Sequence, residues 1–115
     1  MRSQLYKPNP QSGVKNNPEN SSVRKIFLKE NYPNPFNTHT VISFFIPESC
    51  PIKLTIFNSL GQEVRDLYKT REATGHFRIT WDGKDNNGGA AGSGVYICVL
   101  NAGGYVLGKK LLLLR

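Results

Sequence analysis

Short apolar segments separated by turn-forming residues dominate this sequence, and their spacing restricts the fold more than any other feature. In residues 40–47, Ile42, Phe44 and Ile46 alternate with other side chains, which is typical of a strand with one buried face. No segment has the 3.6-residue apolar period of an amphipathic helix. Six or seven short strands of this kind predict an all-β fold, an antiparallel β-sandwich. The other predicted strands are residues 52–58, 63–68, 75–81, 95–101 and 105–114.

The segments between these strands contain residues that favour turns. Residues 58–62 include a glycine that can adopt positive φ, and residues 101–104 are typical of a hairpin turn. Residues 82–94 are predicted to form a long, glycine-rich loop. Pro51 is expected to break the chain between two strands.

The N-terminal part of the chain has a different composition. Residues 1–26 are rich in Asn, Ser, Lys and Pro, so they cannot bury enough apolar surface to offset the entropy of ordering. We predict a disordered linker there and one folded domain over residues 27–115. At its start, prolines fix the irregular segment NYPNPFN (residues 31–37). We expect Tyr32 and Phe36 to hold this segment on the core.

The charge distribution argues against a nucleic-acid partner. The formal net charge is +7 at pH 7, but residues 1–26 carry +4 of it. The folded part is therefore only mildly basic, and its charges are scattered along the sequence. A nucleic-acid interface would instead cluster Lys and Arg among exposed aromatic side chains.

Neither a membrane segment nor a cysteine scaffold is evident. The N-terminus lacks the apolar stretch that a secretory signal needs, and residues 111–114 are too few to span a bilayer, so no membrane insertion is expected. Cys50 and Cys98 are too few for a disulfide-dense scaffold or a four-cysteine zinc site. They could form one bridge in an oxidising compartment, although Cys98 lies in an apolar strand, where a free thiol packs as a small hydrophobe.

No residue pattern points to catalysis, a cofactor or a metal. The segment DGKDNNG (residues 82–88) superficially resembles a calcium loop, but Lys84 occupies a ligand position and no bidentate Glu follows. A turn in which Asp and Asn bond their own backbone explains it better. His39 and His76 belong to no catalytic arrangement, and the apolar surroundings of Cys98 favour an inert thiol. We therefore expect a protein that is not an enzyme.

Three segments together resemble a known family. They are NYPNPFN (residues 31–37) followed by TVISF, IFNSLGQEV (residues 56–64), and a stretch from WDG through SGVY to KKL (residues 81–111). In this order and spacing the chain resembles the type A C-terminal sorting domains of proteins exported by the type IX secretion system of Bacteroidota and related phyla. The resemblance covers about residues 27–115, the whole predicted domain.

This resemblance implies an immunoglobulin-like sandwich that acts as a secretion and sorting signal. Such domains direct a fused N-terminal passenger from the periplasm through the outer-membrane translocon. A sortase-like peptidase then removes the domain, and many passengers are attached to the cell surface. The implied partners are the type IX translocon, the peptidase and the passenger, and the implied location is secreted or cell-surface. Cleavage is expected within residues 15–30. Because Met1 opens directly on the linker, we expect the chain to be a piece of a longer precursor.

Two elements of the family pattern define the predicted recognition site. They are a Gly-x-Tyr element and a terminal basic-aliphatic element. A terminal strand can offer an unpaired edge to a partner strand, which supports recognition there. Structural roles are the alternative, with the tyrosine in the core and the lysines protecting an edge from aggregation. The predicted translocon-recognition residues are Gly94, Tyr96, Lys109, Lys110, Leu111, Leu112, Leu113, Leu114 and Arg115.

Two other functions remain open from the sequence. One is an Ig-like accessory module that binds carbohydrate or protein, for which Tyr68, Tyr105 and Phe57 are the outward-facing aromatic candidates. The other is a structural assembly domain, because the turn and Trp-Asp-Gly segments are also similar to the Ig-like part of the flagellar hook-capping protein. Loss of the last five residues is expected to abolish sorting but to leave ligand binding intact.

Overall fold

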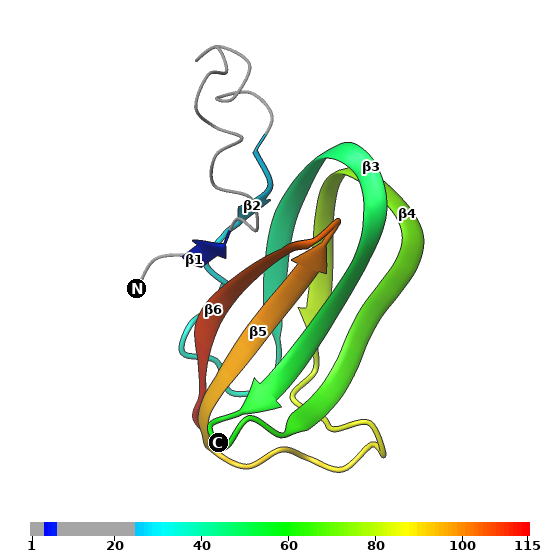
Figure 1. The fold of residues 1–115 in the computed structure, drawn as a ribbon. Helices are drawn as coiled ribbons and strands as arrows, with labels where there is room; N and C mark the ends of the chain where they lie inside the picture. The colour runs from blue at the N-terminus through cyan, green and yellow to red at the C-terminus, as the bar shows by residue number, and fades with distance from the viewer. Residues whose placement is uncertain (1–3, 7–24) are drawn as a thin grey trace.

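The computed structural model describes residues 4–6 and 25–115, and the regular elements within them are all β-strands (Figure 1). Neighbouring strands pair antiparallel, so the predicted all-β antiparallel fold is confirmed. The strands are β1 (Gln4–Tyr6), β2 (Phe27–Leu28), β3 (Thr40–Asn58), β4 (Glu63–Trp81), β5 (Gly94–Ala102) and β6 (Tyr105–Leu113).

β3 and β4 form one long hairpin that bends over on itself (Figure 1). The sequence predicts two strands in each of these regions, but each is a single strand of 19 residues. The register of pairing shifts between Ile46 and Cys50 and again between Cys50 and Ile52. Pro51 therefore lies in a bend and does not end the strand, because bulges accommodate the extra residues and the ladder resumes beyond them.

This bend places the two halves of the hairpin in opposite layers of the sandwich. Residues 40–46 of β3 lie between β2 and β4 in one layer. Residues 52–58 of β3 lie between β4 and β5 in the other, where β6 and β1 continue the sheet. β5 and β6 are joined by the predicted tight turn, in which Gly103 and Gly104 both adopt positive φ. The strand order is β1-β6-β5-β3-β2, with β4 beside β3.

One apolar core fills the space between the layers. The alternating residues predicted to point inward from the first half of β3 are all buried. The second half contributes Leu54 and Ile56, and β5 contributes Cys98 and Leu100, all fully buried. The near-continuous apolar sequence of β5 thus supplies one buried face to the core, as the period of two residues requires.

The irregular segment of residues 31–37 is held on the core as predicted, but by one aromatic residue and not two. Phe36 is buried, and its ring centroid lies 5.6 Å from that of Trp81. Tyr32 is 80% exposed, so the expectation that it anchors the segment through its ring is wrong. It contacts β3 through a pair of backbone hydrogen bonds with Val41.

β1 lies in the region predicted to be a disordered linker. Its three residues pair with Val106, Leu107 and Gly108 of β6. The rest of the predicted linker up to residue 24 lies outside the described residues, as does most of the expected cleavage region.

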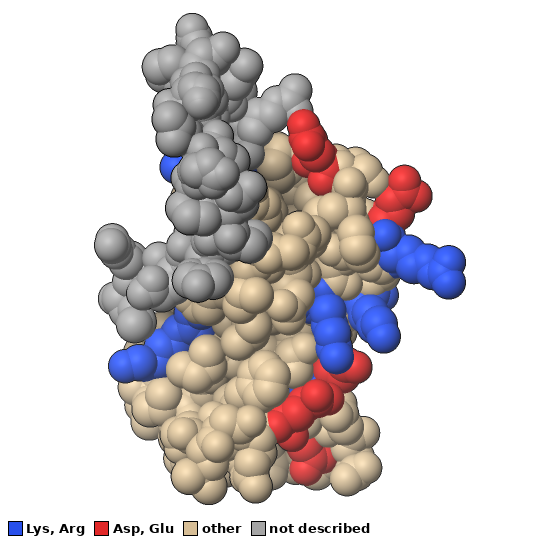
Figure 2. Space-filling view, in the orientation of Figure 1, with Lys and Arg blue, Asp and Glu red and all other residues tan. Residues whose placement is uncertain are grey.

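Charged side chains of both signs are interspersed over the face seen in Figure 2.

Candidate docking site at the C-terminal strand

The four leucines of the predicted tail alternate between core and surface. Leu111 to Leu113 belong to β6, where the period of two residues produces this alternation, and Leu114 follows the end of the strand. Leu111 and Leu113 are fully buried, whereas Leu112 is half-buried and Leu114 is 51% exposed. Two of the four leucines among the predicted recognition residues are therefore part of the core.

The two lysines of β6 also differ in environment. Lys109 is buried, and its Nζ lies 3.4 Å from Glu30 Oε2 in an ion pair. This pairing offsets the cost of removing the ammonium group from water. Lys110 is exposed. Only Lys110 therefore presents its charge at the protein surface, beside the edge of β6.

The outer edge of β6 is occupied by other parts of the same chain. β1 pairs with residues 106–108. Further along, the Phe36 amide donates to Leu112 O (3.0 Å), and the Leu114 amide donates to Phe36 O (2.9 Å). Asn34 Oδ1 accepts a hydrogen bond from the Leu112 amide (3.0 Å). The prediction of an unpaired edge is wrong at these positions, and a partner strand would have to displace them.

A groove lies beside the stretch of β6 between these two covered parts. Its lining includes Glu30, Asn34, Pro35, Lys110 and Leu112. Asn34 Nδ2 donates to Lys110 O at 3.4 Å on one side of it. The groove brings the NYPNPFN segment and the terminal strand together at one surface.

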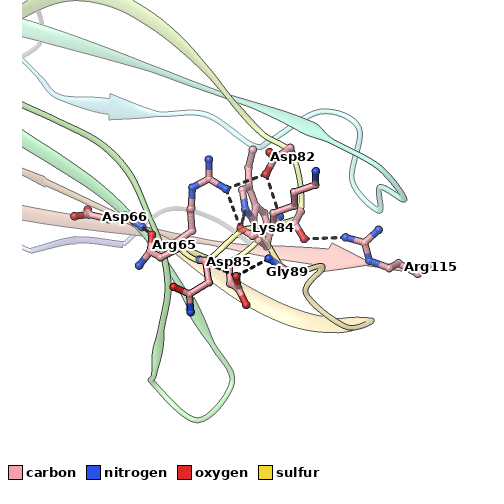
Figure 3. Close-up of polar contacts among 11 residues, drawn as sticks. Arg65, Asp66, Asp82, Lys84, Asp85, Gly89 and Arg115 are labelled. Atoms are coloured by element: carbon pink, nitrogen blue, oxygen red, sulfur yellow. Dashed lines mark hydrogen bonds and ion pairs between the residues drawn. The ribbon is translucent and has the colours of Figure 1, made fainter.

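Arg115 ties the end of the chain to the loop of residues 82–94 (Figure 3). Its backbone amide donates to Ser93 Oγ (2.8 Å), Nε donates to Ala91 O (2.7 Å), and Nη2 donates to Gly83 O (2.8 Å). Gly83 has φ of +74°, and a Cβ added there would lie 2.7 Å from Arg115 Nη2. The positive φ favours glycine here, and any Cβ would also displace the Arg115 guanidinium. The terminal arginine fixes the loop in place.

The acidic residues of this loop bond their own backbone, as the turn interpretation predicts (Figure 3). Asp82 Oδ1 accepts from the Lys84 amide and from Arg65 Nη1, both at 3.0 Å, and Asp85 Oδ1 accepts from the Gly89 amide (2.9 Å). Burial tends to raise the pKa of Asp82, but the Lys84 hydrogen bond and the Arg65 charge outweigh it and hold the pKa below its ordinary value. Among the described residues, no group of three or more His, Cys, Asp or Glu could hold a metal ion.

Tyr96 and Gly94 have structural roles. The Tyr96 ring is buried with its centroid 5.3 Å from that of Trp81, and its hydroxyl donates to Gly92 O (2.6 Å). Gly94 begins β5 with φ of +153°. Both residues shape the return of the loop into β5, which favours the core alternative for Tyr96.

The accessible part of the predicted site is therefore small. Lys110, Leu114 and Arg115 remain exposed, and with the groove beside Lys110 they define the candidate docking site. Sequence reasoning missed Glu30 and Asn34, which line the groove from a distant segment. The sequence indicates them only by position, because Glu30 directly precedes the NYPNPFN segment and Asn34 lies within it.

The aromatic residues suggested for a binding module do not form a platform. Tyr68 and Tyr105 are half-buried and pack against the core. The Tyr68 ring lies 6.0 Å from that of Phe77, measured between centroids. Phe57 is also half-buried and pairs with Ile97 of β5. In the part of the chain that the structure describes, no helix is long and apolar enough to cross a membrane.

The strand order and the packed terminal strand define an Ig-like β-domain. The family described as the FlgD Ig-like domain matches residues 40–104, more than half of the chain. The chain therefore belongs to the FlgD Ig-like domain family. The match begins after Pro35 and ends before β6, so the residues of the candidate docking site lie outside it.

Two solved structures share the fold at low sequence identity. FlgD from P. aeruginosa has a TM-score of 0.54 and 19% identity over 78% of this chain and 74% of that chain. PorZ, a surface component of the type-IX secretion system of Porphyromonas gingivalis, has a TM-score of 0.52 and 19% identity over 83% of this chain. Only 12% of the PorZ chain is covered. No curated protein matches.

Proposed function

We propose that this chain is a non-enzymatic Ig-like docking domain, which acts by being bound within a larger protein assembly. Membership of the FlgD Ig-like domain family carries this proposal. The comparisons favour a structural assembly domain over a sorting signal, because both the family match and one of the similar structures are FlgD. In this form the domain holds its attached protein in place within the assembly.

A specific arrangement favours the second form, a sorting signal of the type IX secretion system. The three segments that carry the resemblance to sorting domains meet at one end of the sandwich. Phe36 forms a β-bridge with Leu113, and Trp81 contacts both Phe36 and Tyr96. Asn58, from the second segment, pairs with Tyr96 of the third. We infer that a translocon would recognise this folded end, with Lys110 and Leu114 facing outward.

A localisation experiment with point variants separates the two forms. Removal of residues 111–115 would be uninformative, because Leu111 and Leu113 belong to the core and their loss would unfold the domain. The full chain is instead fused behind a Sec signal and a fluorescent passenger in a bacterium with an intact type IX system. Lys110→Glu reverses the exposed charge at the groove, and Lys69→Glu makes the same change at an exposed position of β4.

A sorting signal predicts surface display of the parent fusion and of Lys69→Glu, with Lys110→Glu retained in the periplasm. If the parent fusion is folded and stays in the periplasm, the sorting form is rejected. A structural assembly domain then predicts that the parent fusion, but not Lys110→Glu, elutes in a high-mass complex after cross-linking in a host that contains its partners.

A further inference from the structure

The outer face of the layer formed by β2, the first half of β3 and the second half of β4 carries a row of aromatic rings. Phe27, Phe45 and His76 are directly opposite one another on these three strands. The Phe45 and His76 ring centroids are 4.6 Å apart with a tilt of 41° between the ring planes. Phe27 is 56% exposed, His76 is exposed and Phe45 is half-buried. This row faces away from the core.

A second row, about 7 Å along the strands, carries cations, because same-face residues are two positions apart. It consists of Lys29, Ser43 and Arg78. Lys29 and Arg78 are exposed. The salt bridges between described residues, Arg65–Asp82 and Lys109–Glu30, involve neither of them. Both charges are thus available to an external anion.

The two rows line one groove in the protein surface. Its lining includes Phe27, Phe45 and His76 from the aromatic row and Lys29, Ser43 and Arg78 from the cationic row. An outward-facing position of an antiparallel sheet is ordinarily polar, and neither Phe27 nor Phe45 follows that rule. Exposed aromatic side chains beside unpaired cations commonly mark a binding surface.

We propose that this aromatic–cationic groove binds a polysaccharide that carries carboxylate groups. A pyranose ring can lie its apolar C–H face on the Phe27 and Phe45 rings. A carboxylate on that ring then extends toward the next row, where Lys29 and Arg78 can bind it with charge-assisted hydrogen bonds. The Ser43 hydroxyl between them can bond a sugar hydroxyl. Among the described residues that line the groove there is no carboxylate, so none of them repels an anionic chain.

A glycan fits this surface better than an acidic protein segment does. Protein hot spots are aromatic or Arg anchors in well-packed, desolvated pockets at the centre of an interface. Here the rings lie in a row across a sheet face, with strands about 4.8 Å apart, so that one sugar ring can span two of them. This proposal goes beyond the docking function and does not depend on it.

Binding of the full chain to polygalacturonate, measured by titration calorimetry at low salt, tests the proposal. Phe27→Ala removes an exposed ring and is expected to weaken binding about tenfold. The double variant Lys29→Gln, Arg78→Gln is expected to weaken binding at least as much and to reduce its salt dependence. Leu60→Ala and Lys69→Gln change an exposed apolar residue and an exposed cation elsewhere, and binding should stay at the parent level. Thermal unfolding confirms that each variant is folded.

Several results would overturn the proposal. The absence of binding heat on titration with polygalacturonate would reject the proposal directly. Equal binding by Phe27→Ala and the parent would show simple charge attraction without ring stacking. Equal affinity for neutral dextran would remove the carboxylate requirement. Equal affinity for polyglutamate would indicate an acidic protein partner and would reject the glycan.

Discussion

Burial decides the chemistry of the two cysteines at the scale of single residues. Cys98 is fully buried in the core, and burial raises the pKa of its thiol to about 12. The thiol is therefore protonated at neutral pH, and Cys98 packs as the small hydrophobe that the sequence predicts. Cys50 is half-buried in the bend of β3, where burial also raises its pKa. Both cysteines are free.

We expect Cys50 to react with iodoacetamide in the folded protein while Cys98 stays unmodified until the protein unfolds. Thiolate formation and access both control alkylation, and Cys98 lacks both. Mass spectrometry of peptides, after labelling at neutral pH with and without urea, measures each site. Labelling of Cys98 at the rate of Cys50 without urea would contradict the structure.

Asp82 is a second residue whose environment sets a measurable property. Its pKa is lowered in the folded state, so its contribution to stability is present above the unfolded value of 3.8 and is lost as pH falls through the folded pKa. We expect Asp82→Asn to lower the free energy of unfolding at pH 7 by less than about 1 kcal/mol, since the pair with Arg65 is partly exposed and screened by solvent.

Urea unfolding at pH 7 and at about pH 2 measures this effect, because Asp82 is ionised at pH 7 and its protonation increases as the pH falls through the folded pKa. The difference between parent and variant should be smaller at the lower pH. Asp66→Asn changes an exposed carboxylate outside this network and serves as the control. A difference that is the same at both pH values would exclude the ionic contribution.

At the scale of single elements, the leucines at the end of β6 divide between the core and the surface. Leu111 and Leu113 face the core, and Leu112 and Leu114 face outward, although the four residues are identical in sequence. The neighbours of the strand decide this, because Phe36 pairs with its edge while the Phe36 ring packs against Trp81 in the core. Recognition of this strand by a partner must therefore use its exposed side or its edge.

We expect Leu113→Ala to lower the free energy of unfolding by about 2–4 kcal/mol, because it leaves a cavity in the core. Leu114→Ala at the exposed neighbouring position should change it by less than about 1 kcal/mol. Urea unfolding, followed by the fluorescence of the buried Trp81, compares the two variants directly. Equal effects would mean that the strand is not held in this register.

At the scale of the whole molecule, the first and last segments of the domain are neighbours. The NYPNPFN segment pairs with the end of β6, and the loop before β5 is held by Arg115 (Figures 1 and 3). A signal at this end is consequently a property of the folded domain, and it would be lost on unfolding even if every residue of the tail were present. The docking proposal and the glycan proposal concern different surfaces, so one can fail without the other.

The sequence by itself determined the all-β class, the turns at residues 58–62 and 101–104, the long loop and the inward faces of the alternating strands. These features depend on local period and on residues that favour turns, which neighbouring residues encode. Only the tertiary structure decided which leucines of β6 are buried, that β3 continues through its bend, and that the edge of β6 is covered. It also assembled the groove of Phe27, Phe45 and His76. Each of these depends on pairing between segments far apart in the chain, and a local pattern carries no information about the partner it will meet.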